Sequence, residues 1–314
     1  MNILVSTTIN FNPGDCFIRF GVTRLFEQVF PCPHNYVYYN RNPDLRGLSN
    51  ITSNCLITAP LNEFDLVLGA GTPEWFGDVY RPLYEALEGD FNHVPLIMLG
   101  IGSAVGYSEL WSSNRRDVMY RNNTYITTRD KYTKQIIDRK DIKVLPCPAL
   151  FCRELDWTTP IQEKKTLYIL QSSKATNHLI SSQLQENIEQ NLPKDANILC
   201  FYKDEFFYYK KKHKNVRYIA DPKEALDYIR EFPRVVSTRL HGAIAALAMG
   251  KEAVLLNTED NVRVKEAAKV FGKMIPYVNT FEQAQKTKGA TFDEIKEFKE
   301  KTRKAYLVEL EKFK

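Results

Sequence analysis

The chain has 314 residues, of which 44% are hydrophobic and 26% are charged, and its formal net charge is +5 with a pI near 8.7. These proportions are those of an ordinary globular protein and exclude an intrinsically disordered chain. The positive balance is too small to indicate nucleic-acid binding, and it is compatible with an anionic small substrate. At this length we expect two domains of about 150 residues each.

The sequence shows no targeting or membrane-spanning pattern. Residues 2–6 form an apolar run that is too short for a secretion signal, and no run of about 18 apolar residues occurs. The six cysteines are dispersed, without Cys-x-x-Cys spacing or matching histidines, so we expect free thiols and no metal site. These features favour a cytoplasmic protein.

In the first half of the chain, apolar runs of strand length alternate with helical patterns, which predicts a parallel sheet flanked by helices. The expected strands are 2–9, 36–40, 64–68, 95–99, 124–128 and 142–145, and the expected helices are 16–30, 78–88, 108–121 and 131–139. We interpret residues 1–155 as an N-terminal Rossmann-like domain, with a polar linker at 153–165.

The second half repeats the alternation. Strands are expected at 166–171, 197–202, 216–219, 234–238, 253–256 and, as a short segment, 274–278, with helices at 176–191, 222–231, after 240, and at 261–271. We interpret residues 164–290 as a C-terminal Rossmann-like domain. Thr291 and Glu294 form a capping box that opens a long helix, and we expect residues 291–314 to pack back on the N-terminal domain.

Ligands of open parallel sheets bind beyond the carboxyl ends of the strands. The loops at these ends contain Gly14-Asp15, Gly69 to Glu74, Gly100 to Gly106, Arg129-Asp130, Ser172 to Lys174 and Arg239 to Gly242. In two facing sheets such loops would line one interdomain cleft. Neither glycine loop fits a dinucleotide fingerprint, so Gly71 and Gly102 either let the backbone approach another ligand or only make tight turns.

The turn with Arg239 and His241 is the strongest candidate active centre. It joins the strand 234–238 to a helix rich in alanine, so free backbone N–H groups, a guanidinium and an imidazole should meet there. Such a turn can bind a phosphate or carboxylate and move protons. The alternative for His241 is a histidine satisfied within the core.

Four other candidates also have simple structural alternatives. Asp130 could cap a helix and pair with Arg129, and Asp15 has the same ambiguity. Lys174, which follows Ser173 after a strand, could reach a phosphate or remain solvated.

The run from Tyr208 to Lys214 interleaves basic residues with tyrosines and is the strongest charge feature of the chain. Such a run could bind RNA or anionic lipid, but the end of a solvated element is the preferred interpretation.

Taken in order, these loops resemble the polysaccharide pyruvyl transferase family. The resemblance lies in Asn12-Pro13-Gly14-Asp15, Leu68-Gly69-Ala70-Gly71, Leu99-Gly100-Ile101-Gly102, Thr128-Arg129-Asp130, Pro146-Cys147-Pro148, Thr238-Arg239-Leu240-His241-Gly242 and Val254-Leu255-Leu256. It implies an α/β fold of two Rossmann-like domains facing across a cleft, the GT-B type. The N-terminal domain would be the acceptor side and the C-terminal domain the donor side.

The resemblance also implies an activity, the transfer of a pyruvyl group from phosphoenolpyruvate to a sugar hydroxyl, forming a ketal. Arg239, Leu240 and His241 would contact the donor, with Arg129 or Lys174 neutralising its charge. The backbone near Ser173, Gly71, Gly102 and Gly242 would lie against substrate. No cofactor is needed.

Two roles and two functions stay open at this stage. His241 either transfers a proton or binds phosphate, and Asp15 or Asp130 serves as the base. The partners would be a small-molecule donor and a sugar or glycan acceptor, with no nucleic acid; a lipid-linked acceptor would place the protein at the inner face of the membrane. The alternatives are a GT-B glycosyltransferase that uses a nucleotide sugar and a non-catalytic glycan-binding descendant.

Overall fold

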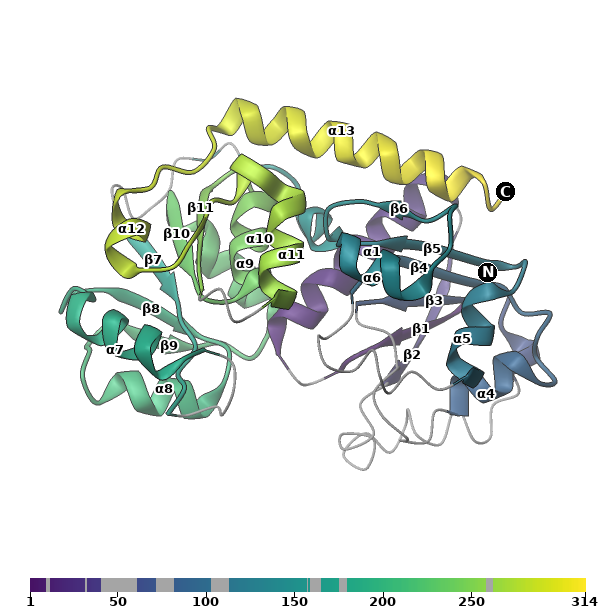
Figure 1. Ribbon diagram of the computed structural model, residues 1–314, viewed down its shortest axis with the longest axis horizontal. Helices are drawn as coiled ribbons and strands as arrows, with labels where there is room; N and C mark the ends of the chain where they lie inside the picture. Colours follow the sequence, from purple (N-terminus) through teal and green to yellow (C-terminus); the bar gives the residue numbers. More distant parts are fainter. Residues whose placement is uncertain are drawn as a thin grey trace.

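A computed structural model describes residues 1–9, 12–31, 33–40, 61–71, 82–102, 113–156, 158, 165–174, 180–257 and 262–314. Parts of two glycine loops, Thr72 to Glu74 and Ser103 to Gly106, lie outside these residues, as does most of the expected linker. Within the described residues, two six-stranded sheets are present, and all of their strand pairs are parallel (Figure 1). The expected α/β architecture with two sheets is confirmed.

The first sheet has the strand order β2-β1-β3-β4-β5-β6. Its strands are β1 (Asn2–Thr7), β2 (Asn35–Asn40), β3 (Leu66–Ala70), β4 (Leu96–Ile101), β5 (Thr124–Thr128) and β6 (Lys143–Val144). The helical segments around it are α1 (Pro13–Val29), η1 (Leu61–Glu63), α4 (Pro82–Glu88), α5 (Ser113–Tyr120), α6 (Lys131–Ile137) and η3 (Pro148–Phe151). The order reverses between β1 and β3, so the loops after these strands diverge there and open a ligand position.

The second sheet has the order β12-β11-β10-β7-β8-β9, which reverses between β7 and β10. Its strands are β7 (Thr166–Ile169), β8 (Asn197–Cys200), β9 (Val216–Tyr218), β10 (Arg234–Ser237), β11 (Glu252–Leu256) and β12 (Tyr277–Val278). The helical segments are α7 (Ser182–Asn191), α8 (Lys203–Lys210), α9 (Pro222–Arg230), α10 (Leu240–Ala248), α11 (Val262–Phe271), η4 (Gly272–Met274), α12 (Phe281–Lys286) and α13 (Phe292–Glu311). The Arg239 turn therefore follows a strand at the reversal.

Two short helices, α8 and α12, were not predicted from the sequence. Helix α8 has the sequence KDEFFYYK, in which four aromatic residues lower the intrinsic helix propensity and hide the helical pattern. It is stabilised by packing, because Glu205 and Tyr209, one turn apart, are both buried. Helix α7 begins at Ser182, and Ser181 caps it by accepting a hydrogen bond from the Leu184 N–H.

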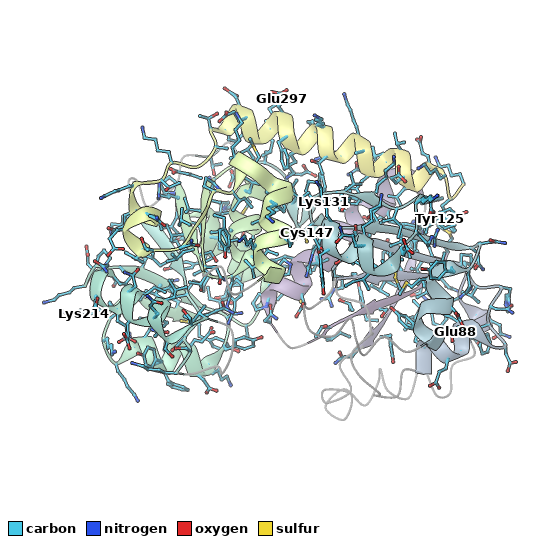
Figure 2. All side chains as sticks on the ribbon, viewed as in Figure 1. Glu88, Tyr125, Lys131, Cys147, Lys214 and Glu297 are labelled. Carbon is cyan, nitrogen blue, oxygen red and sulfur yellow. The ribbon has the colours of Figure 1, made fainter. Side chains whose placement is uncertain are left out.

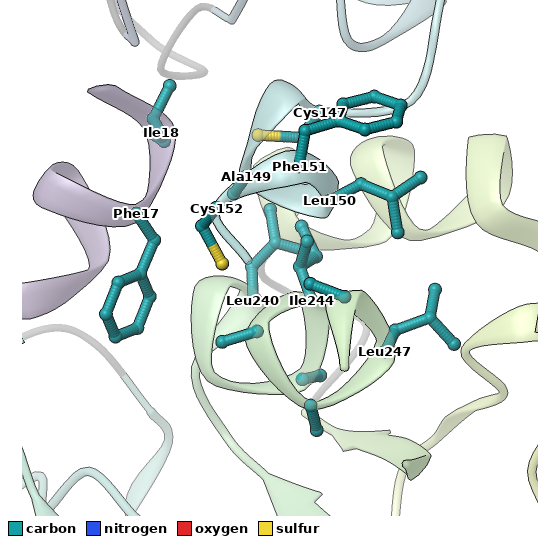
Figure 3. Packing of buried hydrophobic residues seen from close by; sticks show 14 of the residues in the cluster. Phe17, Ile18, Cys147, Ala149, Leu150, Phe151, Cys152, Leu240, Ile244 and Leu247 are labelled. Atoms are coloured by element: carbon teal, nitrogen blue, oxygen red, sulfur yellow. The ribbon is translucent and has the colours of Figure 1, made fainter. Parts of the chain in front are cut away.

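One apolar core joins the two sheets. It contains Phe17 of α1, the η3 segment, and Leu240, Ile244 and Leu247 of α10, which Figure 3 shows packed together. Gly21 permits the contact between α1 and η3, since a Cβ there would lie 1.8 Å from the Pro148 carbonyl oxygen. The carboxyl ends of both sheets are thus brought together by apolar packing directly behind the candidate loops.

Helix α13 lies across both halves of the molecule (Figure 1). Its first part contacts the second half, where the ring centroids of Phe298 and Phe271 are 6.0 Å apart. Just after its end, the chain contacts the first sheet, where the ring centroids of Phe313 and Tyr125 are 5.1 Å apart. The predicted capping box of Thr291 and Glu294 is present. No described helix is long and apolar enough to cross a bilayer.

Candidate active site

The loop before α1 and the turn before α10 meet between the two sheets. The first turn of α1 contains Gly14, and a Cβ on this residue would lie 3.0 Å from His241 Cβ and 3.2 Å from His241 Nδ1. Glycine is therefore the residue that lets the backbone of α1 rest on the imidazole. Asn12, at the N-cap of α1, crosses to the other half, donating from Nδ2 to Tyr202 Oη at 3.4 Å.

Arg129 enters the same place from the end of β5. It is only 1% exposed, and its Nη1 lies 3.4 Å from His241 Nε2. Its Nε and Nη2 atoms are buried and have no hydrogen-bond partner among the described residues. Gly102 makes room for the guanidinium, because a Cβ there would lie 2.2 Å from Arg129 Nε. The result is a buried positive charge with donors available to an anion.

His241 lies in the first turn of α10, two residues after the N-cap residue Arg239. An arginine can only donate hydrogen bonds, so Nε2 of His241 must be the acceptor in its contact with Arg129. No side chain caps the start of α10, which leaves its first turn suited to an anion.

Arg239 has different surroundings. Its Nη2 lies 2.5 Å from Oε1 of Glu205, which is fully buried on α8. The guanidinium also stacks on two aromatic rings, with its Cζ 4.6 Å from the ring centroid of Tyr202 and 5.5 Å from that of Phe201. The charge of Arg239 is therefore largely compensated within the protein.

Asp15 is a carboxylate that lies where the two halves meet. It is half-buried in the first turn of α1, next to Gly14, and its Oδ2 accepts a hydrogen bond from Asn12 Nδ2 at 2.8 Å. Burial raises the pKa of Tyr202, the other partner of Asn12, although Arg239 opposes this. A protonated Tyr202 hydroxyl keeps a lone pair available to Asn12.

Comparison with known proteins places the chain in a family. The family model described as "Polysaccharide pyruvyl transferase" matches residues 12–261, which include Asn12, Arg129, Arg239 and His241. The chain belongs to the polysaccharide pyruvyl transferase family. No curated protein sequence matches it.

Solved structures show how the fold of this family member is shared. A candidate UDP-N-acetylglucosamine 2-epimerase from Listeria monocytogenes is similar with a TM-score of 0.56 and 11% identity over 96% of this chain and 90% of the other. The UDP-GlcNAc 2-epimerase of Methanocaldococcus jannaschii has a TM-score of 0.51 and 13% identity over 97% and 98%. A glycosyltransferase involved in avilamycin A biosynthesis has a TM-score of 0.51 and 13% identity over 99% of this chain and 97% of the other. At these identities the similarity shows a common fold, here two Rossmann-like sheets of the GT-B type.

Two predicted site residues of this pyruvyl transferase family member are placed elsewhere. Asp130 is the N-cap of α6, where its Oδ1 accepts a hydrogen bond from the Thr133 N–H at 2.6 Å. Lys174 is exposed and lies 3.5 Å from Glu189. Burial raises the pKa of Glu189, but hydrogen bonds from Lys212 and Tyr208 outweigh it and lower this pKa to about 2. Glu189 is thus an ionised partner for Lys174.

Three further predicted contacts take part in packing. Gly242 faces the sheet, since a Cβ there would lie 2.7 Å from Ser237 Oγ and 3.1 Å from Ile169. The Leu240 side chain is 7% exposed and belongs to the shared core (Figure 3). The Ser173 N–H donates to Gln185 at 3.1 Å. For Leu240, only backbone groups are left to a ligand.

The described glycines of the two loops make turns or close contacts within the protein. Gly100 has a φ of 60° and packs on the Pro148 ring, so it serves the fold. Gly71, with a φ of 96°, makes the turn after β3. Gly102 lies against Arg129 and therefore shapes the site.

The sequence did not indicate Glu205, Tyr202 or Phe201 as site residues. All three follow β8, beside the strand β7. The available signal was position alone, since they lie beyond the carboxyl end of a parallel strand. A carboxylate in a short charged segment reads as solvated, and only the burial of Glu205 opposite Arg239 contradicts that.

Proposed function

We propose that this protein transfers a pyruvyl group from phosphoenolpyruvate to a sugar hydroxyl of a polysaccharide or glycan precursor, forming a ketal. Membership of the family supports a transferase. One observation carries the choice of donor: Arg129 is buried, lies 3.4 Å from His241, and has two guanidinium nitrogens without a hydrogen-bond partner among the described residues. A buried charge of this kind calls for an anionic ligand.

The phosphate or carboxylate of the donor would bind between Arg129 and the start of α10. Arg129 offers charge-assisted hydrogen bonds, and the first turn of α10 offers backbone N–H groups and the positive end of the helix dipole. Arg239 stabilises the wall of this position through Glu205 and Tyr202. The donor would then lie between the two halves, held by α10 of the C-terminal half and by Arg129 of the N-terminal half, with the rest of the N-terminal half as the acceptor side.

The reaction requires one proton to be added and two to be removed. Protonation of the donor methylene carbon makes it a methyl group and leaves a cationic neighbouring carbon, which a sugar hydroxyl attacks. A second hydroxyl then displaces phosphate from that carbon and closes the ketal. His241 is the proton-transfer group in this scheme because its imidazole lies in the site next to Arg129. No redox step occurs, so no cofactor is needed.

Asp15 is our candidate for the base that accepts the proton of the first sugar hydroxyl, and the proton of the second would return to the His241 imidazole, which has given one to the methylene carbon. Asn12 orients its carboxylate at 2.8 Å, and Asp15 lies in the same turn as Gly14, which contacts His241. Asp130 is less suited because it caps α6.

A nucleotide-sugar glycosyltransferase is the second candidate, since proteins with this fold include one glycosyltransferase and an epimerase in complex with UDP-GlcNAc and UDP. A diphosphate on the donor side would need uncompensated cations there. The two cations that the sequence indicated for a phosphate on that side, Arg239 and Lys174, are paired with Glu205 and Glu189. The pairing favours the smaller donor bound at Arg129.

The test is to incubate the protein with phosphoenolpyruvate and a panel of glycosides and to measure phosphate release. We expect release that depends on the glycoside and is lost in His241→Asn, while the surface variant Lys174→Gln keeps it. Calorimetric titration with phosphoenolpyruvate and with nucleotide sugars separates the candidates. Binding of a nucleotide sugar without binding of phosphoenolpyruvate would contradict the proposal, and binding of a glycan without turnover would indicate a non-catalytic descendant.

A further inference from the structure

The outer surface of α8 combines lysines with an exposed phenylalanine. We call this the α8 face; it consists of Lys203, Phe207, Lys210, Lys211 and Lys214. Lys203, Phe207 and Lys210 are spaced by four and three residues and share one side of the helix. Lys211 and Lys214 follow in the turn beyond it, where Lys210 Nζ donates to the Lys214 carbonyl at 3.0 Å. All five are exposed, and Phe207 is 59% exposed.

The opposite side of α8 is firmly held by the protein. Glu205 and Tyr209 are buried, and Tyr209 Oη donates to the Gln171 carbonyl at 2.8 Å. Phe206 packs against the core of the second sheet. The helix therefore cannot rotate to bury Phe207 without losing these contacts.

The charge of the α8 face is little compensated. Lys203, Lys211 and Lys214 have no ion pair among the described residues. Asp204 is the exposed carboxylate within the helix. The four lysines of the α8 face and Asp204 together have a net charge of three positive units. Lys212, in the same basic run, is different because it pairs with Glu189 at 2.8 Å.

We propose that the α8 face docks on an anionic lipid bilayer. Clustered lysines are attracted to the negative surface of such a bilayer, and an aromatic side chain among them gains by entering the boundary with the acyl chains. A soluble polyanion would use the lysines but would gain nothing from Phe207. The inference concerns this surface only and does not depend on the identity of the donor.

The position of α8 gives this docking a consequence for the site. The helix starts immediately after Tyr202, whose ring stacks with Arg239 and whose hydroxyl accepts from Asn12. Figure 2 shows Lys214, at the other end of the face, pointing away from the molecule. A bilayer that contacts α8 would lie close to Tyr202 and Arg239. A lipid-linked acceptor in that bilayer would therefore be near the candidate site.

Vesicle sedimentation tests the proposal with the full chain. We expect the protein to pellet with phosphatidylcholine–phosphatidylglycerol vesicles and not with phosphatidylcholine vesicles, and to be released by salt. The triple variant Lys203→Gln, Lys211→Gln, Lys214→Gln should lose about five-fold in vesicle affinity for each lysine. Phe207→Ser should lose about ten-fold on vesicles.

A matched control removes three lysines from the other half of the molecule. Lys131, Lys134 and Lys140 line a groove beside α6, and their change to glutamine alters the net charge equally. This variant should bind vesicles as the wild type does. Circular dichroism melting of each variant confirms that it is folded.

Two outcomes with the variants would overturn the proposal. One is equal loss of vesicle binding in both triple variants, which would indicate net charge rather than a docking face. The other is wild-type vesicle binding by Phe207→Ser together with lysine-dependent binding of dextran sulfate, which would indicate a site for a soluble polyanion. Absence of vesicle sedimentation by the wild-type protein would also overturn the proposal.

Discussion

Arg129 and Arg239 each follow a parallel strand and reach the place where the two sheets meet, yet their surroundings differ. Arg239 pairs with the buried Glu205 at 2.5 Å and stacks on Tyr202. Arg129 contacts the His241 imidazole at 3.4 Å and keeps two nitrogens without a hydrogen-bond partner in the described part of the chain. A buried guanidinium paired with a carboxylate has its charge balanced within the protein, whereas one without a counter-charge can bind an anionic ligand.

The comparison shows why residue type and position are insufficient to rank two arginines. The sequence interpretation put phosphate on Arg239 and gave Arg129 a supporting role. In the structure, the difference between the two lies in what faces them, which is a buried carboxylate in one case and His241 in the other. Variants of the two arginines and of the residues that contact them test which arginine binds the donor.

Glu205→Gln should have the largest effect. It leaves the Arg239 charge buried without its carboxylate, which costs about 3–5 kcal/mol in the free energy of unfolding. Urea denaturation measures this loss. The exposed neighbour Asp204→Asn is the control, and the double variant Glu205→Gln, Arg239→Met should recover most of the stability. An unchanged denaturation midpoint for Glu205→Gln would mean that Arg239 is not held by this pair.

Lys299, which contacts the C-terminal end of α10, should affect the stability of the protein without affecting the candidate site. Lys299 of α13 is buried and donates from Nζ to the Ala248 and Arg153 carbonyls, each at 2.6 Å. Burial lowers its pKa from 10.5 to about 8, against the opposing effect of Glu154. From about pH 8 to about pH 10.5 the unfolded chain binds this proton and the folded chain does not, so stability rises with pH across that window.

We therefore expect the stability of the wild type, relative to Lys299→Met, to increase by about 3 kcal/mol between these two pH values. Denaturation at a series of pH values measures it, with the exposed Lys304→Met as the control. Parallel curves for wild type and Lys299→Met would refute the prediction. Affinity for phosphoenolpyruvate should be the same in both proteins at neutral pH, since Lys299 lies behind the site.

Arg129→Met should separate binding from stability. Loss of charged hydrogen bonds to the donor should weaken phosphoenolpyruvate binding by about 1.5–3 kcal/mol, or about 10- to 150-fold, while the free energy of unfolding stays equal or rises because a buried charge is removed. Arg239→Met should instead lower stability, since it removes the guanidinium that pairs with the buried Glu205. Calorimetry and denaturation measure the two quantities. If Arg129→Met binds the donor normally and unfolds more easily, Arg129 is structural.

Gly102→Ala should have a smaller effect on the same arginine. The added Cβ would lie 2.2 Å from Arg129 Nε and displace the guanidinium, which we expect to cost about 1–3 kcal/mol in donor binding. Gly89→Ala is the matched control, because the nearest atom to a Cβ there is at 3.4 Å. Equal phosphoenolpyruvate affinity of the two variants would show that the guanidinium has room to move.

Lys174→Gln should change least. The Lys174 side chain is exposed and lies 3.5 Å from Glu189, so its removal should leave donor affinity within about two-fold of the wild type. Titration with phosphoenolpyruvate checks this. A large loss would show that Lys174 leaves Glu189 for the donor and that the donor side has a free cation after all.

Much of the fold was open to prediction because local patterns specify it. Buried parallel strands read as short apolar runs, and the capping box of Thr291 and Glu294 marks the start of α13. Helix α8 was not predicted because its aromatic residues have low helix propensity and its burial depends on the second sheet. The burial of Lys299 on α13 was not predicted because lysine is normally exposed.

By itself, the sequence determined the alternation of strands and helices, hence the two parallel sheets, and the set of loops at their carboxyl ends in which Asp15, Arg129 and His241 occur. Only the tertiary structure decided which side chains of these loops face one another. Arg129 and His241 are 112 residues apart, and Glu205 and Arg239 are 34 apart. Contacts of this range depend on how two sheets pack through one core, and the charge left on each arginine depends on those contacts.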